Sequence, residues 1–328
     1  MGRFLEEEKQ RQYQFKMTST SFSTEAKSDG FYKSSDRPFC LPVIHSAENL
    51  APNIRENAIK FFTDNEIKWH DGSNGNPSNH LCDSQVSCVN FLFPFSDHPR
   101  SLKALLRPVF PEIQGMLPVE NDKFVSFEWI GEKNYLGERM PRNGKRTRGA
   151  NFTSTDAIVS FLRSDAKKQV VLIEWKYTES YTPVPLVTAK SGTDRVKIYQ
   201  HLYDKPDCLL RKELIPGFES LFYEPFYQFM RQQFLAHEME ITRELGADIV
   251  SVLHIAPAHN IDFQRITSES LKHLGTSSTG VWSALVKDQR FKSVRTEKLF
   301  GDYLKLGDAE LFESFAYLHA RYSMLFEA

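Results

Sequence analysis

The chain has 328 residues, and its 41 Lys and Arg side chains almost balance 42 Asp and Glu, so that the formal net charge is -1 at pH 7. This balance excludes a protein that attracts nucleic acid through its overall charge, so any site for a polyanion has to be a local basic patch. Hydrophobic residues make up 41% of the chain and charged residues 25%, which is ordinary for a soluble globular protein. The length allows two ordinary domains or one elaborated domain, and we expect one domain over residues 31–328.

The first residues predict neither a targeting signal nor a folded element. The stretch "MGRFLEEEKQRQYQFK" is acidic and polar, whereas a signal peptide needs a basic start and an apolar run, and no later segment approaches a membrane-spanning length. Four cysteines without CxxC spacing fit reduced thiols, so the expected location is the cytoplasm. Residues 1–30 are rich in Ser and Thr and lack periodic apolar positions, which predicts a disordered or weakly attached arm.

The next segments alternate between helical and extended patterns. Apolar residues at Ile54, Ala58, Phe61 and Phe62 have helical spacing. "SQVSCVNFLFPF" is typical of a short amphipathic helix that stops at Pro94, because proline cannot continue a helix. "KFVSFEWI" alternates as a strand does.

Two further strands, Asp156 to Leu162 and Val170 to about Tyr177, flank the polar turn "RSDAKK". A hairpin centred near Asp165 or Ala166 places Asp156 opposite residues 174–176.

A long helix is predicted within "SLFYEPFYQFMRQQFLAHEMEITRELG", with Pro225 near its start and Gly246 as its C-terminal cap. The strand "ADIVSVLHIAP" that follows has the composition of a strand buried on both faces, and the region after Thr267 is a weaker mixture of helix and strand.

The predicted hairpin brings three ionisable residues together. Side chains alternate across a strand, so Glu174 and Lys176 share one face while Trp175 points to the other. Asp156 adds a second carboxylate to the same end of the hairpin, and two close carboxylates repel each other unless they share a proton or bind a divalent cation. Mg²⁺ prefers oxygen ligands, and a lysine beside it can orient a water and stabilise developing charge. The alternative is a cross-strand ion pair at an exposed strand end, which contributes little.

The stretch from Asp156 to Lys176 resembles the PD-(D/E)XK nuclease superfamily, although Thr155 stands where that pattern has proline. "HLCDSQVSCVNFLFPF", "FEWIGEKNYLGER", "RGANFTSTDAIVSF", "VVLIEWKYTESY" and "FYQFMRQQFLAHEME" are similar to one bacterial branch of it, over about residues 79–256. The resemblance implies a restriction-endonuclease-like α/β fold with an αβββαβ core, in which helices flank a mixed central sheet. It also implies Mg²⁺, or Mn²⁺ in its place, on Asp156, Glu174 and the Trp175 carbonyl, with Lys176 at the attacking water.

Three residues are candidates for supporting roles. Gln85, on the first core helix, stands where many superfamily members have an acid, so it could orient a water or phosphate. Glu128 is either the missing acid or a strand-end carboxylate that faces solvent. Gln232, next to Arg231, lies where related nucleases place a glutamine facing the site, or else on a solvated helix face.

The loop "RMPRNGKRTR" contains no acid and leads toward Asp156. It is placed to touch a nucleic-acid backbone, since phosphate contacts need only charge and reach, although most basic loops are merely solvated. Its basic residues are Arg139, Arg142, Lys145, Arg146 and Arg148.

The expected function is Mg²⁺-dependent hydrolysis of phosphodiester bonds, with DNA as the expected substrate. The first alternative is a non-catalytic nucleic-acid-binding module that keeps the nuclease fold. The second is an interaction protein with a fortuitous ion pair. Specific binding of Mg²⁺ or Mn²⁺ would separate the enzyme from the interaction protein.

Overall fold

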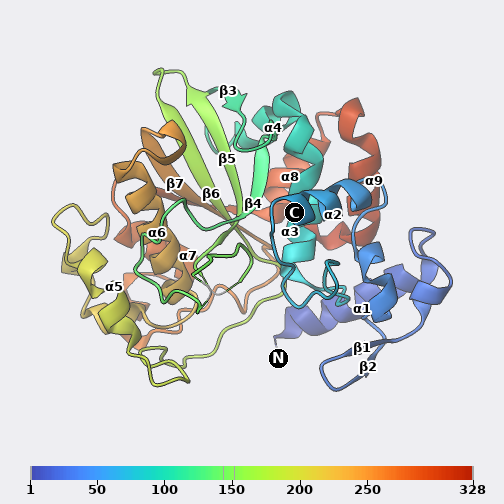
Figure 1. Ribbon diagram of the computed structural model, residues 1–328, viewed down its shortest axis with the longest axis horizontal. Coiled ribbons are helices and arrows are strands. Elements are labelled where there is room, and N and C mark those ends of the chain that lie inside the picture. Colours follow the sequence, from blue (N-terminus) through green and yellow to red (C-terminus); the bar gives the residue numbers. More distant parts are fainter. Residues whose placement is uncertain (1, 143, 151, 327–328) are drawn as a thin grey trace.

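A central mixed sheet, with helices on both of its faces, forms the middle of the protein in a computed structural model that describes residues 2–142, 144–150 and 152–326 (Figure 1). The strand order is β3-β5-β6-β7-β8, and β4 pairs with the same strand, β5, as β3 does. Strand β5 pairs antiparallel with β3, β4 and β6, while β7 pairs parallel with β6 and with β8. The strands are β3 (Ile113–Leu117), β4 (Val125–Trp129), β5 (Thr155–Arg163), β6 (Lys168–Trp175), β7 (Ile249–Ala256) and β8 (Phe291–Arg295).

The predicted hairpin between β5 and β6 is confirmed. Its register runs from Ala157 opposite Ile173 to Leu162 opposite Lys168, and Ala166 has the positive φ of 62° that closes the turn. One further step along this register brings Asp156 to Glu174, and the Asp156 carboxylate bonds the amide of the next residue, Trp175.

Strand β6 is buried on both faces because helices cover the sheet from each side. Val171 and Ile173 belong to one apolar cluster with helices α2, α3, α8 and α9, and Val170 and Leu172 belong to a second with α5, α6 and α7. Strand β7 alternates between the same two clusters, which confirms the expectation for "ADIVSVLHIAP". The helices are α2 (Arg55–Asp64), α3 (Ser84–Leu92), α4 (Pro99–Leu106), α5 (Arg195–Tyr203), α6 (Phe226–Ile241), α7 (Ser278–Leu285), α8 (Thr296–Leu304) and α9 (Phe312–Arg321).

The succession α3, β4, β5, β6, α6, β7 reproduces the expected αβββαβ order, with β3, α4 and α5 added to it. Two details of the predicted helices are wrong. Helix α3 is not amphipathic, because every residue from Gln85 to Leu92 is buried. Helix α6 ends at Ile241, and Gly246 instead lies in a separate 3-10 turn, where its φ is +70°.

The expectation of a disordered arm over residues 1–30 is also wrong; Met1 of that range lies outside the described residues. Arg3–Thr18 form helix α1, and Gly30–Tyr32 begin a small hairpin of β1 with β2 (Ser35–Arg37). Helix α1 buries a stripe of four side chains that are four residues apart, and three of them are polar. The sequence therefore lacks the periodic apolar residues from which a helix is predicted. The stripe is Phe4, Glu8, Gln12 and Lys16.

Each buried polar side chain of α1 has a specific partner. The Gln12 amide donates to the Tyr177 hydroxyl at 3.1 Å and accepts from Arg321 of α9 at 2.9 Å, while the Tyr177 hydroxyl donates to Glu8. Lys16 Nζ donates to the backbone carbonyl of Cys40 at 3.2 Å. Helix α1 is therefore fixed to the residue that follows Lys176. No helix in the described part of the chain is both long and apolar enough to span a bilayer.

Candidate active site

The end of β6 and the beginning of β5 bring the three predicted residues together. Glu174 is 1% exposed and Lys176 4% exposed, and the Lys176 ammonium forms an ion pair with Glu174 Oε1. Asp156 Oδ2 accepts a hydrogen bond from the Trp175 backbone amide at 2.7 Å. The exposed ion pair that was the alternative is thus wrong, because this pair is buried.

The backbone explains why Asp156 can reach Trp175. Strand β6 continues beside β7, where the Lys176 amide donates to the Ile255 carbonyl at 2.8 Å, but on its other side the pairing with β5 stops at Ala157 opposite Ile173. The Trp175 amide therefore has no backbone acceptor there, and the Asp156 carboxylate takes that place. Because the N–H and C=O of one strand residue point to the same side, the Trp175 carbonyl faces Asp156 too. Ser84 Oγ of α3 lies 3.5 Å from that carbonyl oxygen.

The electrostatics of the site follow from burial and from repulsion between carboxylates. Burial raises the pKa of Asp156 well above its usual value, and the nearby Glu174 raises it further, with Lys176 opposing both. Burial by itself would lower the pKa of Lys176, but the attraction of Glu174 raises it well above the usual value. Lys176 therefore keeps its proton at neutral pH.

Glu128 lies inside the protein and not at its surface, so the solvent-facing alternative is wrong. Its Oε1 accepts from Gln85 Nε2 at 2.7 Å, and its Oε2 accepts from Ser154 Oγ at 2.7 Å. Burial raises its pKa, the two hydrogen bonds lower it, and Glu174 raises it again. Its φ of +50° is rare for a residue with a side chain and costs on the order of 1–3 kcal/mol, which indicates a position imposed by its surroundings.

The two glutamines both face this group of acids. Gln232 of α6 is fully buried, donates to Glu174 Oε2 and lies 3.4 Å from the Ser154 carbonyl oxygen, which excludes the solvated helix face for it. Gln85 of α3 accepts from the His70 amide at 2.8 Å while it holds Glu128. Ser154 thus connects Glu128, through its hydroxyl, with Gln232, through its backbone carbonyl. The sequence analysis did not name it, although its spacing of two from Asp156 on an extended segment could have indicated it.

The basic loop divides into residues that stabilise the fold and residues that remain exposed. Arg148 donates to the Phe127 carbonyl at 3.0 Å and forms an ion pair with Glu120 at 2.9 Å, and Arg146 donates to the Gly131 carbonyl at 3.0 Å. Their guanidinium groups bind the backbone beside β4, so the predicted phosphate contacts of these two residues are not supported. Lys145 pairs with Glu66 at 2.5 Å, and Arg139 and Arg142 are exposed.

The donor set around Asp156 fits a hard divalent cation. Within the described residues, no group of three or more His, Cys, Asp or Glu side chains is arranged to hold a metal ion. The available ligands are instead two carboxylates, of Asp156 and Glu174, and the Trp175 carbonyl, which are all oxygens. Such a set suits Mg²⁺, whose remaining positions are commonly filled by water, and a bound cation would relieve the repulsion that raises the Asp156 pKa.

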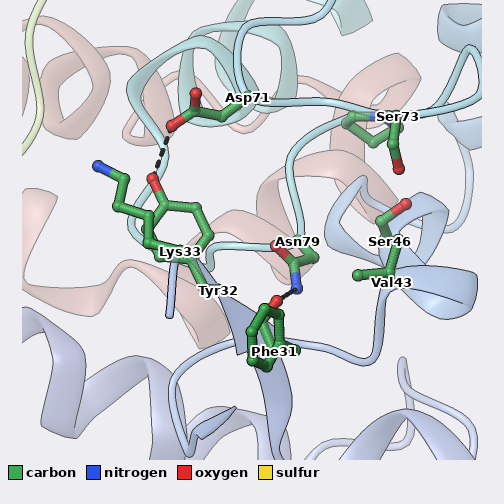
Figure 2. Close-up of a pocket in the computed structure, with 9 residues that line it drawn as sticks. Phe31, Tyr32, Lys33, Val43, Ser46, Asp71, Ser73 and Asn79 are labelled. Atoms are coloured by element: carbon green, nitrogen blue, oxygen red, sulfur yellow. Dashed lines mark hydrogen bonds between the residues drawn. The ribbon is translucent and has the colours of Figure 1, made fainter. Parts of the chain in front are cut away.

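A cavity of about 280 Å³ lies between the β1–β2 hairpin and the loop of residues 71–79 (Figure 2). The Tyr32 hydroxyl donates to Asp71 at 2.6 Å across its wall, and Asn79 donates to the Phe31 carbonyl at 3.1 Å. It contains none of the candidate residues, so it is distinct from the site at Asp156.

Comparison with known protein families gives one match, to the family described as "Restriction Endonuclease associating with ARP", over residues 10–323. Because this match spans nearly the whole chain, the protein belongs to that restriction-endonuclease family. No curated protein and no solved structure matches the chain significantly. Membership of the family indicates a nuclease-related function and an interaction with nucleic acid.

Proposed function

We propose that this member of the restriction-endonuclease family is a metal-dependent nuclease of the PD-(D/E)XK type that hydrolyses phosphodiester bonds of DNA. The observation that carries the proposal is the meeting of Asp156, Glu174 and Lys176 at the paired ends of two buried strands. A buried ion pair is costly to assemble and is a weak way to stabilise a fold, which favours a chemical role for these residues.

The ligands of the cation would be Asp156, Glu174 and the Trp175 carbonyl. When bound there, Mg²⁺ would supply Lewis-acid stabilisation of phosphate charge and a more acidic water. Gln232 holds one oxygen of Glu174, which fixes the orientation of that carboxylate. Ser154 and Gln85 likewise fix Glu128 behind it.

Lys176 acts as a charge and as a hydrogen-bond donor. In the metal-free protein the attraction of Glu174 raises the pKa of Lys176, so its side chain is charged at neutral pH. Its ammonium group orients the attacking water and stabilises the negative charge that develops on the phosphate oxygens.

The experiment that tests the function is incubation of the purified protein with labelled single- and double-stranded DNA and RNA in Mg²⁺. We expect cleavage of DNA by the wild type and its loss in Asp156→Asn and in Glu174→Gln. Asp165→Asn, in the turn at the far end of the same hairpin, is the matched control and should cleave at the wild-type rate.

Full activity in both site variants would refute the assignment of the site. Nucleic-acid binding by the wild type without cleavage would favour the alternative, a non-catalytic binding module.

A further inference from the structure

Arg231 of α6 lies beside the candidate site with most of its hydrogen-bonding capacity unused. Its Nη1 donates to Thr153 Oγ1 at 3.2 Å, and its guanidinium carbon lies 4.6 Å from the centre of the Tyr227 ring. Its Nε is buried and has no partner among the described residues, where Arg231 also forms no ion pair. A guanidinium carries five N–H donors, so a partly buried one with a single bond is under-satisfied.

Other buried arginines of the protein differ from Arg231. Arg148 uses its donors on the Phe127 carbonyl, Ser126 and Glu120. Arg321 binds Gln12, Asn49 and the Leu81 carbonyl. A buried Nε without a partner in the described part of the chain also occurs in Arg55, Arg146 and Arg290, but each of these has a backbone carbonyl or a carboxylate on an Nη group, whereas Arg231 has the Thr153 hydroxyl.

The acids near Arg231 do not use these donors. Glu138 accepts from the Thr153 amide at 2.8 Å and from the Tyr199 hydroxyl at 3.0 Å. Glu224 contributes to the electrostatic environment of Arg231, of Glu174 and of Lys176, but its buried Oε2 has no hydrogen-bond partner among the described residues. The guanidinium therefore lies near two acids without a hydrogen bond to either among the described residues, and its remaining donors can take an acceptor from outside the chain.

The position along the chain links Arg231 to the reacting groups. Gln232, the residue after Arg231, binds Glu174. Thr153, to which Arg231 donates, is followed by Ser154 and by strand β5 with Asp156. We infer that Arg231 binds a backbone phosphate of the nucleic-acid substrate next to the bond that is cut, an inference that rests on the proposed function.

The chemistry of the guanidinium favours a phosphate as the ligand. Its planar fork matches two non-bridging oxygens of one phosphodiester, and the Tyr227 ring holds that plane while Thr153 fixes one edge. A cationic ligand would be repelled, and a neutral one would not offer the guanidinium charge-assisted hydrogen bonds.

The first test measures binding without chemistry, by fluorescence anisotropy of a labelled DNA duplex in EDTA over a series of salt concentrations. In Arg231→Gln we expect affinity to fall about tenfold and the slope of log affinity against log salt to fall by about one unit. Arg231→Lys keeps the charge but not the fork, so its affinity should be intermediate. Arg107→Gln is the matched control and should change neither quantity, because α4 lies against β3 at the opposite end of β5 from Asp156.

The second test places one neutral methylphosphonate at each backbone position in turn. Wild type should lose affinity at one position where Arg231→Gln loses none, because the contact is already absent. If the variant responds like the wild type at every position, Arg231 contacts no phosphate, while cleavage by the wild type leaves the proposed function intact. If the wild type binds no nucleic acid, both the Arg231 contact and the proposed function are overturned. If it binds but does not cleave, the proposed nuclease activity alone is overturned. Should Arg231→Gln fail to fold by circular dichroism, Arg231→Lys replaces it, and its loss of affinity at that position should be smaller than that of the wild type because it lacks the fork.

Discussion

Replacing Lys176 by methionine should both destabilise the metal-free protein and stop catalysis. Lys176 and Glu174 are almost fully buried, so the substitution leaves an uncompensated carboxylate inside the protein, with Gln232 as its remaining donor. Breaking one side of a buried ion pair costs about 3–5 kcal/mol. For 328 residues the entropy of unfolding is roughly 0.7 kcal/mol/K, so the melting temperature in EDTA should fall by about 4–7 °C.

The metal should bind Lys176→Met more tightly than it binds the wild type, because the ammonium no longer competes for Glu174. Calorimetry with Mn²⁺ measures this affinity, and thermal unfolding with and without the metal should show part of the lost stability restored. Cleavage should nevertheless slow by at least about a hundredfold, because the charge that stabilises the transition state is gone.

The double variant Glu174→Gln with Lys176→Met separates the charge from the packing. It removes both charges, so most of the lost stability should return although cleavage does not. Wild-type stability and wild-type cleavage in Lys176→Met would together refute the buried pair and its proposed role.

Three further substitutions test the Asp156 carboxyl, the contacts of the basic loop with β4, and the attachment of α1. Asp156→Asn should raise the melting temperature in EDTA at pH 7, because the raised Asp156 pKa means that ionisation penalises the folded state; the gain should vanish as the pH falls below about 4, where the unfolded carboxyl also binds its proton. Arg148→Gln should lower the free energy of unfolding by about 3 kcal/mol in urea titration, whereas Arg142→Gln should leave it unchanged and weaken DNA binding instead. Tyr177→Phe should cost about 1–3 kcal/mol, since Glu8 and Gln12 of α1 lose a buried partner, and amide exchange in α1 should accelerate.

Each of these has an outcome that contradicts it. A pH-independent gain for Asp156→Asn would exclude a raised pKa as its cause. Equal stability of the Arg148 and Arg142 variants would mean that the loop does not depend on its contacts with β4. Unchanged exchange in Tyr177→Phe would show that α1 is held by other contacts.

Local sequence patterns determined the hairpin and with it the three principal residues of the candidate site. Once the turn at Asp165 and Ala166 is located, antiparallel pairing fixes which residues of β5 and β6 lie opposite each other, and it brings Asp156 to the end of β6 that carries Glu174. The helix after Ile54 was predictable from the helical spacing of its apolar residues, and the buried strand β7 from its nearly continuous apolar run.

Tertiary contacts decided the features that the patterns could not reveal. Helix α1 is stabilised by Tyr177 and Arg321, which lie far from it in the chain, and its buried stripe is mostly polar, so no hydrophobic period marks it. Arg148 and Arg142 are the same residue type in one basic loop, yet Arg148 binds the backbone of β4 and Arg142 is exposed. Whether a polar side chain faces solvent, the backbone or a neighbouring acid depends on what lies across the fold, and a single sequence does not record those distant partners.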